Sequence, residues 1–124
     1  MSLSDYSEEL MLDALLTEMP FFVAFSTEDP GDAGGSIAEP TGNSYARTES
    51  SDFARGDPGS VIANTASVVS PTASGSWGEI THFAIFDAAE SGNFLGSGEL
   101  DTPQTVVSGE ALQANIGDLT ITLD

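Results

Sequence analysis

The chain has no cysteine and no lysine, and it has only one histidine and two arginines among its 124 residues. Without cysteine it can form neither a disulfide framework nor a thiolate nucleophile. Its apolar runs are too short for a membrane-spanning helix, and the N-terminus lacks the basic start and apolar core of a signal peptide. We therefore expect a soluble chain that is made in the cytoplasm and makes no contact with a membrane.

Basic residues are rare and acidic residues are common. Twenty Asp and Glu residues face two Arg residues, which gives a formal net charge of -18 at pH 7. A surface this acidic repels DNA, RNA and anionic lipid, so we expect no direct nucleic-acid partner. Two explanations stay open: general solubility or adaptation to salt, or a need to remain separate from a nearby polyanion.

The length is typical of one domain, since domains commonly have about 100–150 residues. We expect a single domain over residues 1–124, with a helix in 1–19 and a β-sandwich in 20–124. The helix is predicted over 5–19, because Ser4 or Asp5 can cap it and Pro20 ends it. Its apolar side chains form an arc wider than one stripe, so we expect cover on more than one side, from its own sheet or from another subunit.

The stretch from Trp77 to Asp87 holds the only Trp, the only His and two of the seven Phe. Apolar groups occur at both odd and even positions, which predicts a central strand covered on both faces. One cover is expected to be a second sheet, and the other a helix or a neighbouring subunit. Further strands are predicted over 21–27, 43–48, 61–69, 93–100, 104–107 and 119–124.

Short strands at roughly ten-residue spacing, separated by Gly, Pro and Asp turns, are typical of sandwiches. The predicted fold class is mainly β: an antiparallel β-sandwich or jelly roll preceded by one N-terminal α-helix.

Three motifs contain residue types that can carry catalysis or binding. His82 lies in the most apolar strand, where we expect a core histidine with its hydrogen bonds satisfied rather than a general base. The acidic loop 28–36 could bind Ca²⁺ through Glu28, Asp29 and Asp32, but it lacks the spacing of an EF-hand, and a solvated turn is preferred. The Arg55-Gly56-Asp57 tripeptide is interpreted as a turn. We expect no metal, no cofactor and no enzymatic activity.

The order of motifs is informative as a whole. The helix is followed by Phe-Val-Ala-Phe-Ser-Thr-Glu-Asp-Pro-Gly-Asp-Ala-Gly (22–34), Gly-Asn-Ser-Tyr-Ala-Arg (42–47), Gly-Ser-Trp-Gly-Glu-Ile-Thr-His-Phe-Ala-Ile-Phe-Asp-Ala (75–88) and Gly-Asp-Leu-Thr-Ile-Thr-Leu-Asp (117–124). This order resembles a family of small tailed-bacteriophage virion proteins, often labelled tail fibre proteins. The resemblance implies a non-enzymatic structural protein of the virus particle.

Within that class, the charge favours the outer surface of the head, away from packaged DNA. The main hypothesis is a capsid decoration or cement protein, most simply a homotrimer, that binds the major capsid protein or other virion proteins. The alternative is a tail fibre or tail-tip component that takes part in host-surface binding. The interface candidates are Tyr6, Leu10, Met11, Leu15, Met19, Trp77 and Phe83.

Overall fold

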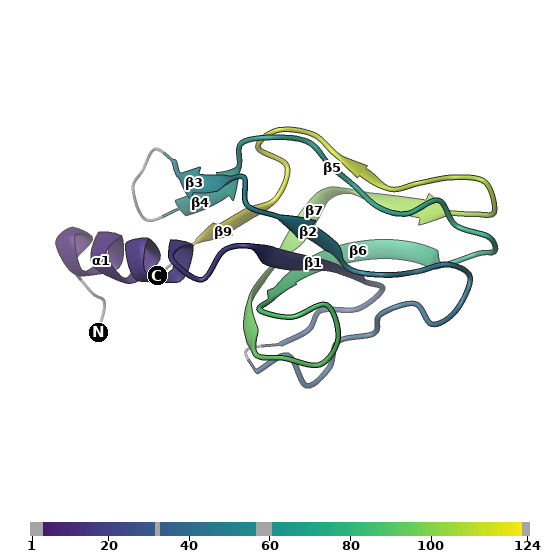
Figure 1. Ribbon diagram of the computed structural model, residues 1–124, viewed down its shortest axis with the longest axis horizontal. Helices are drawn as coiled ribbons and strands as arrows, with labels where there is room; N and C mark the ends of the chain where they lie inside the picture. Colours follow the sequence, from purple (N-terminus) through teal and green to yellow (C-terminus); the bar gives the residue numbers. More distant parts are fainter. Residues whose placement is uncertain (1–3, 32, 57–60, 123–124) are drawn as a thin grey trace.

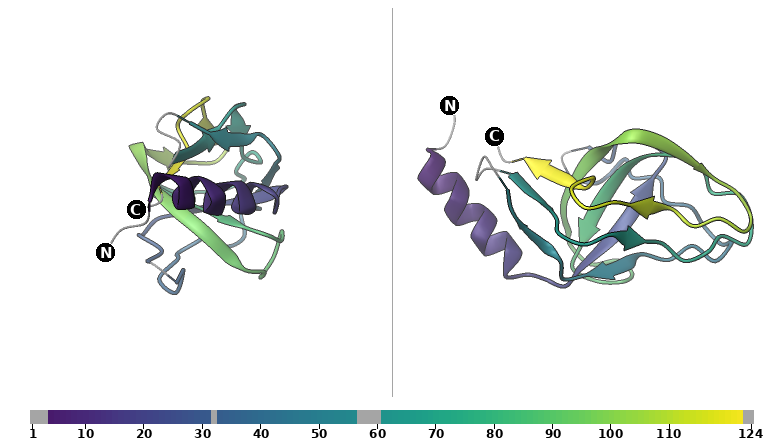
Figure 2. Two further views of the ribbon diagram at one scale, coloured as in Figure 1. Left: turned by 90° about the vertical axis from the view of Figure 1, so that its left-hand side faces the viewer. Right: turned by 90° about the horizontal axis from the view of Figure 1, so that it is seen from above.

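The chain folds into one helix and nine strands within residues 4–31, 33–56 and 61–122, the part that the computed structural model describes. Helix α1 (Asp5–Leu16) projects from one end of a β-rich body (Figures 1 and 2). The strands are β1 (Phe21–Ser26), β2 (Thr48–Ser50), β3 (Phe53–Arg55), β4 (Val61–Asn64), β5 (Val68–Val69), β6 (Gly78–Phe86), β7 (Phe94–Val106), β8 (Gln113–Ala114) and β9 (Thr120–Thr122). The predicted class, mainly β after one N-terminal helix, is confirmed, and the arrangement is consistent with a β-sandwich.

The largest sheet has the strand order β2-β1-β6-β7, with every neighbouring pair antiparallel. Its two central strands, β1 and β6, were both predicted from their aromatic and β-branched residues. They align Phe25 opposite Phe83 and Val23 opposite Ile85. All four side chains are fully buried, so strands β1 and β6 form the floor of the core, the layer on which the rest of the core packs.

Two smaller sheets, β3-β4-β9 and β5-β8, lie over that floor. Their inward side chains, such as Ile62 and Leu119, are fully buried. The main core joins them to the large sheet and to α1; its largest members are Leu12, Phe21, Phe25, Phe53, Ile62, Trp77, Ile80, Phe83, Ile85, Leu100, Leu112 and Leu119.

The opposite face of β6 is also covered, as the sequence predicted. Ala84 and Phe86 form a second small cluster with Ala24 of β1, against which Ile37 and Phe94 pack. The covering residue Ile37 belongs to the long connection between β1 and β2. The expectation of a helix or a second subunit on this face was therefore wrong, because the chain covers it with its own loop.

Strand β7 differs most from the prediction, which divided it into 93–100 and 104–107. It is one strand of 13 residues whose register against β6 shifts between the pairs Ile80–Gln104 and His82–Glu99. Pro103 lies in this irregular part, where it needs no ladder hydrogen bond, and β7 is an edge strand of its sheet. Gly96 and Gly98 lie inside this strand, as expected from the predicted strand over 93–100.

Three other boundaries were also predicted wrongly. The strand expected over 43–48 starts only at Thr48, because Asn43 and Ser44 adopt positive φ values of 54° and 65°. The single strand expected over 61–69 is two strands, β4 and β5. The helix ends at Leu16 rather than at residue 19. The predicted strand 119–124 is observed as Thr120–Thr122, and its last two residues lie outside the described residues.

Gly98 offers a test of the contact between the large sheet and β9. A Cβ atom added there would lie 2.6 Å from a ring carbon of Phe83 and 2.6 Å from the carbonyl oxygen of Thr120. We expect Gly98→Ala to lower the free energy of unfolding by about 1–3 kcal/mol, measured by urea denaturation. Gly35→Ala is the matched control, since an added Cβ there meets no described atom within 4 Å. Equal stability of the two variants would contradict this packing.

Candidate functional site

Helix α1 is built by ordinary capping chemistry. The Ser4 side chain accepts a hydrogen bond from the backbone N–H of Ser7 at 3.2 Å. Asp5 and Glu8 in the first turn suit the positive end of the helix dipole. At the other end, the Thr17 hydroxyl donates to the carbonyl of Ala14 at 2.6 Å. A side chain therefore satisfies one backbone group at each end of the helix.

One side of α1 is covered by the body. Leu12 is 3 % exposed, and Leu15 and Leu16 pack against the main core. Arg55 of β3 adds two ion pairs to α1, at 3.3 Å to Glu9 and 2.7 Å to Asp13. Apolar contact and these ion pairs together fix the helix against the β3 end of the body (Figure 2).

The other side of α1 carries exposed apolar residues that the described part of the chain does not cover. Tyr6 is 71 % exposed, and Leu10 and Met11 are each 51 % exposed. Tyr6 and Leu10 lie four residues apart and therefore share one side of the helix. Met11 is rotated by about 100° from Leu10 and extends the exposed apolar surface around the helix. We call this surface, defined by these three residues, the outer face of α1. The sequence predicted that α1 is covered on more than one side. The described part of the chain covers only its inner side.

The remaining interface candidates from the sequence lie elsewhere. Leu15 and Met19 are half-buried against the core of the same chain. Trp77 is 5 % exposed and Phe83 is fully buried, so the folded chain presents almost none of either ring to a partner. Both assignments are corrected: these rings are core residues, and the sequence alone could not tell an apolar strand buried in its own domain from one buried between subunits.

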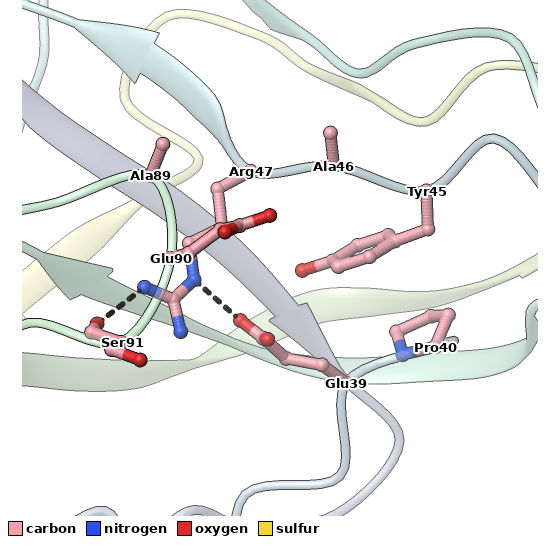
Figure 3. A pocket seen from close by; sticks show the side chains of 8 residues that line it. All are labelled: Glu39, Pro40, Tyr45, Ala46, Arg47, Ala89, Glu90 and Ser91. Carbon is pink, nitrogen blue, oxygen red and sulfur yellow. Dashed lines mark hydrogen bonds and ion pairs between the residues drawn. The ribbon is translucent and has the colours of Figure 1, made fainter. Parts of the chain in front are cut away.

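The second candidate site is a hollow of about 310 Å³ around Arg47 (Figure 3). The Arg47 Nε donates to Glu39 at 2.8 Å, and its Nη1 donates to the carbonyls of Ala88 at 3.0 Å and Ser91 at 2.8 Å. The guanidinium carbon also lies 3.7 Å from the centre of the Phe86 ring. Only 9 % of the Arg47 side chain is exposed. The cluster therefore joins the β1–β2 connection to the β6–β7 turn.

Tyr45 borders the same hollow and is also committed to structure. Its hydroxyl oxygen accepts a hydrogen bond from the backbone N–H of Phe25 at 3.1 Å. Burial raises the pKa of Tyr45 well above its usual range, so the phenol stays neutral. We interpret the hollow as a structural lock and not as a ligand site. Sequence reasoning missed this lock, although one signal was available: Arg47 is one of just two cations in a chain with twenty acids.

Among their described residues, the three chemical motifs hold no constellation typical of catalysis. His82 is half-buried rather than in the core, and its Nδ1 lies 2.8 Å from the Thr81 hydroxyl. Arg55 is engaged with α1, and Asp57 lies outside the described residues. Asp32 of the acidic loop also lies outside them. Within the part of the chain that the structure describes, no three metal-ligating side chains gather, and no helix is long and apolar enough to cross a membrane.

Comparison with known proteins gives a family match. A family model described as podophage GP4 fiber I protein gp80 matches residues 2–122, and the search of curated proteins finds no match. The match covers nearly the whole chain and agrees with the phage resemblance of the motif order. It supports the fibre component that the sequence predicted as an alternative, in the virion as part of a tail fibre, and it gives no support to capsid cement. The chain therefore belongs to the podophage GP4 fiber I protein gp80 family, a family of non-enzymatic structural proteins of phage fibres.

Proposed function

We propose that this chain is a tail-fibre component that attaches to another virion protein through the outer face of α1. The observation that carries the proposal is the exposure of Tyr6, Leu10 and Met11 on a helix that projects from the body (Figure 1). Burying one large apolar side chain is worth roughly 1.5–3 kcal/mol. Three of them exposed on one short helix can therefore anchor a contact of the helix-in-groove type.

The charge of α1 defines the chemistry of the partner. The helix carries Asp5, Glu8, Glu9 and Asp13 and no basic residue. Arg55 pairs with Glu9 and Asp13 on one flank, but the chain as a whole has a net charge of -18. A groove that receives the outer face of α1 should therefore be apolar at its floor and basic at its rim. Neither a major capsid protein as partner nor a cement role is proposed, because the family is one of fibre proteins.

A phage that encodes the triple variant Tyr6→Ser, Leu10→Ser and Met11→Ser tests this attachment. We expect at least a tenfold loss of the chain from purified particles, measured by quantitative mass spectrometry, because the anchoring side chains are removed. The isolated variant should keep the circular dichroism spectrum of the native chain, since these side chains are exposed.

Two controls separate attachment from folding. Ile116→Ser changes an equally exposed apolar residue, 68 % exposed, that does not belong to α1, and it should leave the particle content unchanged. The swap Leu10→Met with Met11→Leu keeps the apolar area of the outer face and should also be tolerated. Native levels of a folded triple variant in the particle would overturn the proposal.

A further inference from the structure

The negative charge of the chain is unevenly distributed, and one end of the body is almost free of it. Segments 41–46, 69–77 and 104–114 contain one charged residue, Glu110, although the chain has twenty acids. The three segments meet at the end of the body opposite α1 (Figures 1 and 2). We call this surface, defined by these segments, the neutral end.

Hydrogen bonds join the three segments into one surface. The backbone N–H of Ser74 and the indole Nε1 of Trp77 both donate to the carbonyl of Asn43, each at 3.0 Å. The Asn43 amide donates in turn to the carbonyl of Ser76 at 3.1 Å. Gly109 belongs to the third segment, and its backbone N–H donates a hydrogen bond to the carbonyl of Ala73 at 2.7 Å. The loops therefore hold a defined shape before any partner arrives.

The side chains exposed on the neutral end are small apolar groups and groups that both donate and accept hydrogen bonds. Val69 is 49 % exposed and Val107 is 44 % exposed. Around them lie exposed hydroxyls and amides: Thr41, Asn43, Ser44, Thr72, Ser74, Ser76, Ser108 and Gln113. The carboxylate of Glu110 accepts a hydrogen bond from the backbone N–H of Val107 at 3.2 Å, so even this charge is turned to an internal contact.

We propose that the neutral end binds the neutral end of a second copy of this chain. A symmetric contact places the same patch on both sides, so the patch must complement itself. Carboxylates only accept hydrogen bonds and cannot pair with one another, whereas hydroxyls and amides both donate and accept. Two copies of charge -18 repel each other over about a Debye length, roughly 8–10 Å in moderate salt, and the repulsion is weakest where both surfaces lack charge.

The same reasoning separates the neutral end from the outer face of α1. A basic partner gains more from the acidic helix than from a surface without charge. A second copy is repelled by the acids of α1, even though Glu8 is buried and Arg55 pairs with two others, and it meets only Glu110 at the neutral end. Self-association is thus assigned to one end and attachment to the other, and the two contacts can fail independently. This symmetric contact pairs two copies, so the homotrimer predicted from the sequence would need a different, head-to-tail contact.

Sedimentation equilibrium of the full chain from about 0.1 M to about 1 M NaCl tests the contact. We expect the native chain to self-associate, more strongly as salt screens the repulsion. Val107→Glu, and separately Val69→Glu, should weaken self-association at least about tenfold, because each places like charges opposite each other in a symmetric contact. Ile116→Glu is the matched control: it adds the same charge at an exposed apolar residue outside the neutral end and should associate like the native chain.

The α1 triple variant should also associate like the native chain, which separates this test from that of the attachment. Circular dichroism of each variant shows whether a loss of association reflects unfolding. A native chain that stays monomeric across the salt series would overturn the proposal, as would association that survives both Val→Glu changes and is lost in the α1 variant. A monomeric chain that binds a saccharide or host cells in a Val107-dependent way would reassign the surface and also overturn it.

Discussion

Replacing Arg47 with alanine should lower the free energy of unfolding by about 3–5 kcal/mol, measured by urea denaturation. The side chain is 9 % exposed, and its guanidinium neutralises Glu39, whose side chain is 23 % exposed. Removing it leaves a carboxylate largely buried without a counter-ion and deprives the carbonyls of Ala88 and Ser91 of their donor. It also removes the cation from the face of the Phe86 ring.

The other arginine supplies the matched control. Arg55→Ala removes two ion pairs, but its side chain is 34 % exposed, and exposed pairs contribute at most about 1 kcal/mol. Arg47→Lys should fall between the two, since an ammonium keeps the charge but cannot serve the same three acceptors in a fork. Equal losses for Arg47→Ala and Arg55→Ala would show that the Arg47 lock does not bear on stability.

Asn64→Ala should destabilise the chain by about 3 kcal/mol, because the buried amide makes four hydrogen bonds that solvent cannot replace. Asn64 is 1 % exposed. Its Nδ2 donates to the carbonyls of Ala66 and Asn115, each at 2.9 Å, and its Oδ1 accepts from Gly117 and Leu119 at 3.1 Å and 3.0 Å. One side chain thus holds the chain just after β4 against the segment that leads into β9.

An exposed amide provides the comparison for Asn64. Gln113 makes one side-chain bond from its Nε2, at 3.2 Å to Asn115, and its side chain is exposed, so Gln113→Ala should change the unfolding free energy by no more than about 0.5 kcal/mol. Thermal unfolding of both variants at one pH checks the difference. A loss for Asn64→Ala as small as that for Gln113→Ala would mean that relaxed backbone or water replaces the amide.

The parts of the fold that the sequence predicted are those set by neighbouring residues. Ser4 caps the start of α1, and the dense aromatic and β-branched residues of β1 and β6 mark the two central strands. The errors arise where distant contacts override local pattern. The prediction separated two strands at residues 101–103, yet these residues lie inside β7 because β6 pairs with it on both sides of them.

The candidate site divides in the same way. The apolar outer face of α1 could be predicted, because Tyr6, Leu10 and Met11 form a local pattern. Trp77 and Phe83 could not be placed, since their burial depends on which sheet packs over β6. The Arg47 lock and the neutral end are also invisible locally, because segments far apart in the chain build them: the first joins residues 39, 47 and 88–91, and the second joins three separate loops.

Trp77, described above as a core residue, makes the molecule its own optical reporter. It is the only indole in the chain, it is almost fully shielded, and its ring meets Tyr45 edge to face at 5.2 Å. Its fluorescence should therefore be emitted at short wavelength in the native state and shift to the red on unfolding. Because the indole N–H is bound to Asn43 at the base of the neutral end, emission should respond when that end is loosened and stay silent when α1 alone is engaged.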